Sequence, residues 1–178
     1  GNLKYVRIEY GGYIFAPDQE INGLTLGAVG RNTIIDYVQC SFINDDAFEW
    51  FGGTVNAAHL VAYRSLDDDF DTDNGYSGSV QFALGVRDPN ISDQGASTSE
   101  GFESDNDATG TTATPQTRAL FSNITEIGPY RGSIIPGGGA TGTFKFRRGA
   151  RIRRNSGLRI FNSILTDYPY GEIGRAHV

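Results

Sequence analysis

The chain has 178 residues, of which 24 are glycine, 38% are hydrophobic and 12% are aromatic, so it can bury the core of one domain and is too apolar for a disordered polymer. The net charge of −6 argues against a nucleic-acid binder, and apolar runs far shorter than ~20 residues exclude a transmembrane helix. A single cysteine, Cys40, excludes an internal disulfide and a zinc site built on paired thiolates.

Short segments in which apolar and polar residues alternate recur along the chain and predict half-buried β-strands. They cover residues 4–10, 36–42, 58–63, 80–84, 119–124 and 158–164. The first four begin about 20 to 32 residues apart, which is the spacing of a solenoid coil rather than of a hairpin. Because no window shows a clear helical period, we expect very little helix.

A second pattern, an aromatic residue followed directly by an acid, recurs between the predicted strands. It occurs at Phe48 and Glu49, at Phe70 and Asp71, and at Phe102 and Glu103. In an extended chain the ring would point inward and the carboxylate outward. These features predict an all-β fold, a right-handed parallel β-helix (β-solenoid), in which equivalent residues of successive coils stack about 4.8 Å apart. The alternative, an antiparallel β-sandwich, lacks the expected regular Asn-Gly or Asp-Gly turns.

We expect one domain over residues 1–171, with a polar excursion from the solenoid at about residues 90–116. Residues 172–178 match an in-frame translation of a sequencing adapter and are expected to be a non-native tail. Since the chain also contains no methionine, we expect a metagenomic fragment of a longer protein, with more of the parent chain at both ends.

The strongest chemical feature is the aspartate-rich block of residues 67–73. Close carboxylates repel one another, so they either take up protons or bind a cation, and Ca²⁺ tolerates an irregular set of oxygens. A solvated acidic turn and a set of catalytic carboxylates are the alternatives. Strand alternation would place four candidate calcium ligands on one face: Asp67, Asp69, Asp71 and Asp73.

Acids of neighbouring coils would extend this set if the coils stack in register. Asp46 and Glu49, one coil earlier, are further candidate metal ligands, and Asp45 lies beside them. Glu103 and Asp105, one coil later, are candidate ligand-binding residues, and Asp107 lies beside them. Together they would form a ridge of carboxylates that binds cations and, through them, a charged polysaccharide. The competing interpretation is that these acids accept backbone N–H groups in tight turns.

Three other residues are candidates for contact with a ligand. Trp50 would stack on a sugar ring unless it packs in the core. Arg64 and Arg87 flank the acidic block and would supply the base that a polysaccharide lyase needs beside its cation. Acids on neighbouring coils would also satisfy the carboxyl spacing of a glycoside hydrolase, but the fold itself produces that spacing, so it discriminates nothing.

Several blocks of the sequence resemble a family of large, uncharacterised bacterial surface or secreted proteins with a pectate-lyase-like β-helical superfold. These blocks are residues 11–12, 44–56, 67–75, 153–155 and 160–163. The resemblance extends over about residues 3–171 and implies export and a β-helix. It supplies no catalytic residues.

The sequence thus predicts a secreted or cell-surface bacterial β-solenoid whose function is non-catalytic binding or display, with calcium at its acidic turns and a polysaccharide as the candidate partner. The alternative is a polysaccharide lyase or glycoside hydrolase that acts on an acidic polysaccharide. The sequence identifies neither the glycan nor any catalytic residue.

Overall fold

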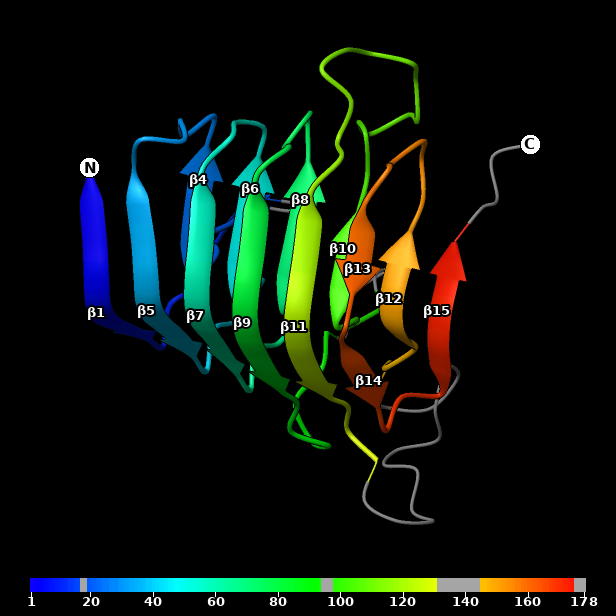
Figure 1. Cartoon of the computed structure of the whole chain (residues 1–178). Helices are drawn as coiled ribbons and strands as arrows, with labels where there is room; N and C mark the ends of the chain where they lie inside the picture. Colours follow the sequence, from blue (N-terminus) through cyan, green and yellow to red (C-terminus); the bar gives the residue numbers. More distant parts are fainter. Residues whose placement is uncertain (17–18, 94–97, 131–144, 175–178) are drawn as a thin grey trace.

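The computed structural model describes residues 1–16, 19–93, 98–130 and 145–174. This part of the chain consists of β-strands and turns and contains no helix, hence none that is long and apolar enough to cross a bilayer. Successive coils advance from the N-terminus, and each contributes strands to two sheets that lie one behind the other (Figure 1). The fold is the right-handed parallel β-helix expected from the sequence.

The longer sheet is built from the segments with alternating burial. Its strands are β1 (Asn2–Glu9), β5 (Ile34–Ser41), β7 (Asn56–Tyr63), β9 (Ser79–Val86), β11 (Leu120–Ile127), β13 (Arg159–Phe161) and β14 (Ile164–Thr166). Every pair in it is parallel, and β13 and β14 pair with the two halves of β11. Parallel pairing across the coils rules out the antiparallel sandwich.

The shorter sheet carries the aromatic–acid pairs. In chain order its strands are β4 (Leu24–Gly27), β6 (Phe48–Phe51), β8 (Phe70–Asp73), β10 (Phe102–Ser104), β12 (Arg148–Ile152) and β15 (Tyr170–Gly174), all paired in parallel. A small antiparallel pair, β2 (Ile14–Ala16) and β3 (Gln19–Glu20), lies between β1 and β4.

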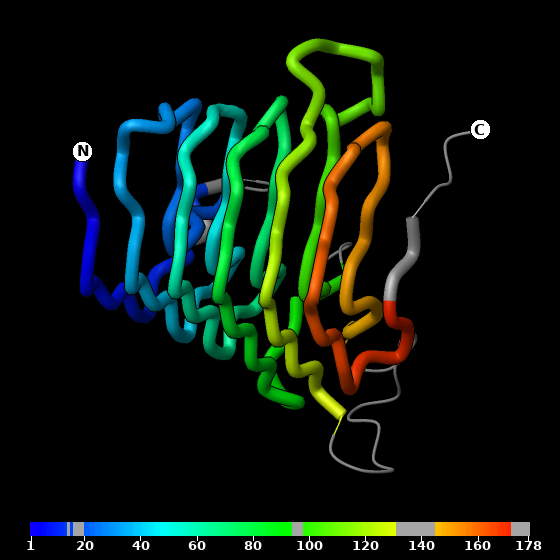
Figure 2. The backbone as a smooth tube through the Cα atoms, in the orientation of Figure 1, coloured from blue at the N-terminus to red at the C-terminus, as the bar shows by residue number. Residues whose placement is uncertain are grey.

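Paired strands occur in both stretches that the sequence analysis sets apart from the coils, residues 90–116 and 172–178. The stretch 90–116 contains β10, so it is not a single excursion: Phe102 anchors a regular coil, and the long loop follows β10 (yellow-green in Figure 2). Residues 94–97 of that stretch lie outside the described residues, as do residues 175–178 of the expected tail. Residues 172–174 continue β15 and pair with β12.

The interior contains a stack of aromatic rings at equivalent positions of the coils. Phe48, Phe70 and Phe102 are directly opposite one another in the sheet and fully buried. Their ring centroids are 5.8 and 5.2 Å apart. The inward direction predicted for these rings is confirmed, and the acid that follows each ring is therefore held on the outer face.

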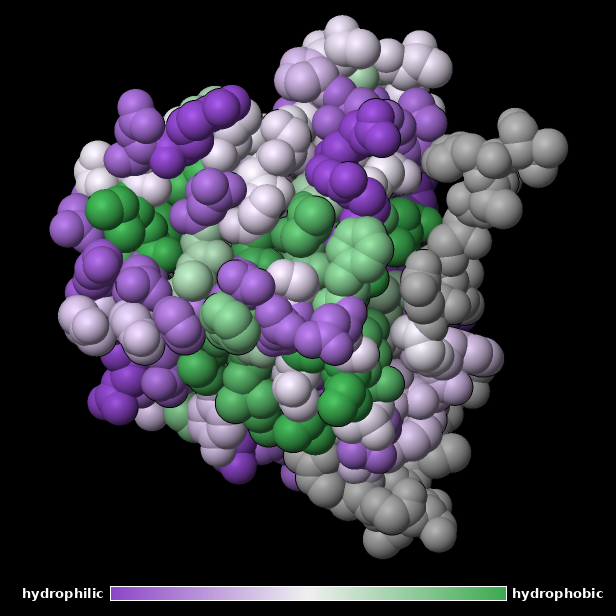
Figure 3. Space-filling model, viewed as in Figure 1, coloured by the Kyte–Doolittle hydropathy of each residue, from purple (hydrophilic) through white to green (hydrophobic). Residues whose placement is uncertain are grey.

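The long strands bend at one position in every coil, and a second set of rings stacks outside the bend. Tyr5, Tyr37, His59 and Phe82 all have φ between 52° and 58°, a backbone conformation that non-glycine residues adopt rarely. Their successive ring centroids lie 4.9, 4.3 and 5.4 Å apart. This outer face also exposes apolar side chains such as Ile164, in keeping with the hydrophobic patches in Figure 3.

Candidate functional site

An acidic ladder, defined as Glu49, Asp71 and Glu103, runs along the outer face of the shorter sheet. Glu49 of β6 lies opposite Asp71 of β8, which lies opposite Glu103 of β10. Because neighbouring strands are about 4.8 Å apart, these carboxylates become neighbours although they are far apart in the chain. The stacking in register that the sequence predicts is confirmed. The next residue along the sheet is Arg151 of β12.

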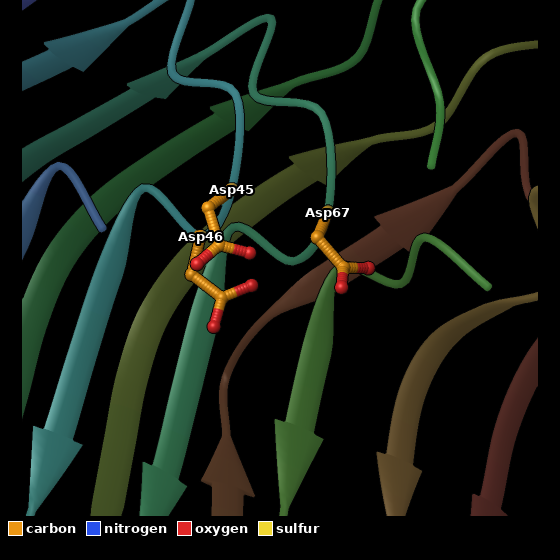
Figure 4. Close-up of side chains that lie close together, drawn as sticks. All are labelled: Asp45, Asp46 and Asp67. Atoms are coloured by element: carbon orange, nitrogen blue, oxygen red, sulfur yellow. The ribbon is translucent and has the colours of Figure 1, made fainter. Parts of the chain in front are cut away.

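Acids from the turns before β6 and β8 adjoin the ladder. Asp45 and Asp46 come from one turn and Asp67 from the next, and their carboxylates point into the same space (Figure 4). The acids form three sets, and in each set one carboxylate oxygen from every member lies within 4.8 Å of the others. The sets are Asp45 with Asp46 and Asp67, Asp46 with Glu49 and Asp71, and Asp68 with Asp71 and Glu103.

Burial and mutual repulsion make these carboxylates costly to ionise. Burial, and to a smaller extent repulsion from Glu20, raises the pKa of Asp45 to about 6. Burial, and to a smaller extent the negative charge of Asp45, raises the pKa of Glu49 to about 8. Burial also raises the pKa of Asp46 and Asp71 well above the ordinary value. Such a site favours either protons or a positive ion.

Several buried oxygens at the site accept no hydrogen bond. Oδ1 of Asp67, Oδ1 of Asp71 and Oδ1 of Asn22 are all in this state. Asn22 precedes β4, and its Nδ2 donates a hydrogen bond to Oε2 of Glu49. A hard cation that takes six to eight oxygen ligands would satisfy these atoms, so the residues present fit calcium.

The acidic ladder ends where arginines of the next coil neutralise it. Nη1 of Arg151 lies 2.8 Å from Oε2 of Glu103, and Arg153 donates to both Glu103 and Asp105. Nη1 of Arg154 lies 2.7 Å from Oδ2 of Asp105. The candidate ligand-binding residues Glu103 and Asp105 therefore already have cationic partners.

The block 67–73 does not present one face, because β8 begins only at Phe70 and the residues before it turn. Asp69 points into the interior, where its Oδ2 lies 3.1 Å from Nε of Arg87 and Ser65 donates to its Oδ1. Asp73, at the end of β8, faces outward and accepts the backbone N–H of Asn74. Among the four predicted calcium ligands of this block, Asp67 and Asp71 are the ones brought together with Asp46 and Glu49.

Three further candidates lie away from any open surface or are already paired. Trp50 is fully buried and stacks on Tyr76, so it cannot serve as a sugar platform. Arg87 is buried beside Asp69 and cannot reach a proton on a polysaccharide. Arg64 lies 3.4 Å from Asp88 and over the ring of Tyr63. For Trp50, core packing is therefore the alternative that holds. Alternation misplaced Asp69, because Asp69 lies in the turn before β8 and not in the strand.

One residue of the site was not expected from the sequence. Asn22 precedes Gly23, and that dipeptide indicates only a turn. The signal that identifies it is three-dimensional, because the turn before β4 brings its amide against Glu49.

Comparison with protein families gave a match to a model described as a pectate-lyase-like β-helix domain, which covers residues 1–165. Comparisons with curated proteins and with solved structures gave no match. The match therefore supports the fold and the resemblance of the sequence blocks.

Proposed function

The chain belongs to the pectate-lyase-like β-helix family, and on this basis we propose that it is a secreted or cell-surface β-solenoid that binds an anionic polysaccharide without cleaving it. Calcium ions held by the acidic ladder and the turns beside it would mediate the contact.

One observation carries the proposal: five acids gather at one edge of the solenoid without a cationic partner. In the described chain, no lysine, arginine or histidine forms an ion pair with any member of this group, which consists of Asp45, Asp46, Glu49, Asp67 and Asp71. An uncompensated buried charge costs several kcal/mol. Calcium would remove that cost and leave coordination positions for the oxygens of a ligand.

The surroundings favour a polyanion as that ligand. The five acids alone would repel a carboxylated sugar, but a bound divalent cation reverses the local charge and can bridge the two. Repeating coils also present equivalent positions along the solenoid axis, which suits an extended chain of sugar units.

Non-catalytic binding is favoured because the arginines near the acids are buried or already paired. A lyase needs a base that can reach the sugar, yet Arg87 is buried with Asp69 and Arg64 is paired with Asp88. Arg151 and Arg153 are paired with the acids at the end of the ladder. We therefore assign binding rather than cleavage to this edge.

Affinity electrophoresis through gels containing polygalacturonate or alginate tests the proposal. Wild-type protein should be retarded with calcium and run freely with a chelator, and D71N should lose most of the retardation. D36N is the matched control, because Asp36 lies on the longer sheet, where it contacts His59 and Lys4. Equal mobility with and without calcium would contradict glycan binding, and calcium-dependent release of unsaturated products would contradict the non-catalytic assignment.

A further inference from the structure

We infer that Asp46 bridges two calcium ions, one held with Asp45 and Asp67 and the other held with Glu49 and Asp71, and that Oδ1 of Asn22 is a neutral ligand on the Glu49 side. The inference rests on the proposed function only in taking calcium as the bound ion, and it adds the number of ions and a ligand outside the acidic block.

Asp46 occupies a position that the two proposed ion sites share. Its carboxylate belongs to two of the three sets of oxygens that lie within 4.8 Å of one another. One set joins it to the turn acids and the other joins it to the ladder. The backbone N–H of Asp68 donates to its Oδ1 at 2.7 Å, which fixes the carboxylate between the two sets.

Asn22 supports the inference independently of the acids, because its side chain is a neutral amide. The residue is only 8% exposed, and its Oδ1 accepts no hydrogen bond. It lines a cavity of about 310 Å³ together with Asp45, Asp46 and Glu49. Since its Nδ2 donates to Glu49, turning the amide over would set two oxygens against each other.

The chemistry of this cavity selects its occupant. Its acids and the Oδ1 of Asn22 are all acceptors when the acids are ionised, so a ligand that only accepts hydrogen bonds would find no partner among them. Calcium binds both carboxylate and amide oxygens, whereas magnesium demands a more regular octahedron. The mixed set of oxygens from turns and strands suits the larger ion.

Two ions come close to neutralising the two sets that share Asp46. The five acids of these two sets carry a charge of about −5 when ionised, and two calcium ions supply +4. The third set contains Glu103, which already pairs with Arg151 and Arg153. A third ion would have to displace these partners.

Native mass spectrometry and calorimetric titration with calcium chloride test the bridge. We expect two calcium ions per wild-type chain and per D36N chain. D67N and E49Q should each retain one ion, and D46N should weaken both sites by tenfold or more. A thermal melt of every variant in chelator would establish that it is folded.

The outcomes separate this inference from the proposed function. One ion per wild-type chain would overturn the bridge and leave calcium-mediated glycan binding intact, whereas no bound calcium would overturn both. Two ions in wild-type protein with unchanged binding by D46N would overturn the bridging role alone.

The role of Asn22 has its own test. N22L removes the amide oxygen at similar volume and should weaken one of the two ions by about tenfold or more. N22D keeps an oxygen ligand but loses the donor to Glu49, so it should bind that ion more tightly than N22L does. Unchanged calcium binding by N22L would overturn the assignment of Asn22 as a ligand.

Discussion

The Nε atom of Arg87 lies 3.1 Å from Oδ2 of Asp69, and both side chains are fully buried between the coils of the solenoid. Arg87 also donates to the backbone carbonyls of Ser65 and Glu100, which belong to neighbouring coils. The guanidinium thus fastens three turns of the chain to one another from the inside. Its charge also offsets the repulsion that Asp69 exerts on the buried Glu126.

Removal of this arginine should be strongly destabilising. R87M leaves the Asp69 carboxylate buried without its partner, and breaking a buried ion pair from one side costs about 3 to 5 kcal/mol. Urea unfolding at neutral pH measures the loss. The control is R64M: Arg64 pairs with Asp88 at the surface, so its replacement should cost at most about 1 kcal/mol. Similar losses in the two variants would show that the buried pair is not a major support of the fold.

The inner aromatic stack should matter far more to stability than the outer one. Phe70 lies between Phe48 and Phe102 and is fully buried, so F70A should cost about 3 to 5 kcal/mol through lost burial and the cavity it leaves. Phe82 is 49% exposed on the outer stack, and F82A should cost much less. Denaturant unfolding of the two variants compares them directly, and a larger loss for F82A would contradict the assignment of the core.

The sequence predicted the ladder well because two local rules agree there. Glu49, Asp71 and Glu103 each follow a phenylalanine that must be buried, and strand alternation then forces the acid outward. The repeat of this pair on successive coils predicts the register without any knowledge of the turns. The all-β parallel fold follows from the same evidence.

The turns were less predictable, since their direction depends on contacts with other coils. Asp69 is one residue before a strand, and its inward direction is decided by Arg87, which lies a full coil away. Asn22 contributes through a turn that carries no chemical motif.

Neutralising a ladder acid should have opposite effects with and without calcium. In chelator, D71N should raise the melting temperature, because like charges directly opposite each other in neighbouring strands are destabilising, by about 1 kcal/mol or less. In calcium, the wild type should gain stability that D71N lacks, since the ion binds the folded state. Melting curves of both proteins in chelator and in calcium test this, and a destabilised D71N in chelator would argue that Asp71 supports the fold itself.

The metal-free protein should lose stability as pH rises, because the pKa of Glu49 is raised in the fold. Its pKa is raised from 4.5 to about 8 in the fold, so the folded state holds a proton that the unfolded chain releases above pH 4.5. Stability in chelator should therefore fall as pH rises from about 4.5 to 8 and level off above that. Because calcium competes with the proton for the same oxygens, its stabilising effect should be small at pH 5 and large at pH 8. Melting curves across this range measure both trends, and E49Q should reduce both. A calcium shift that is equally large at pH 5 would show that the ion does not bind at Glu49.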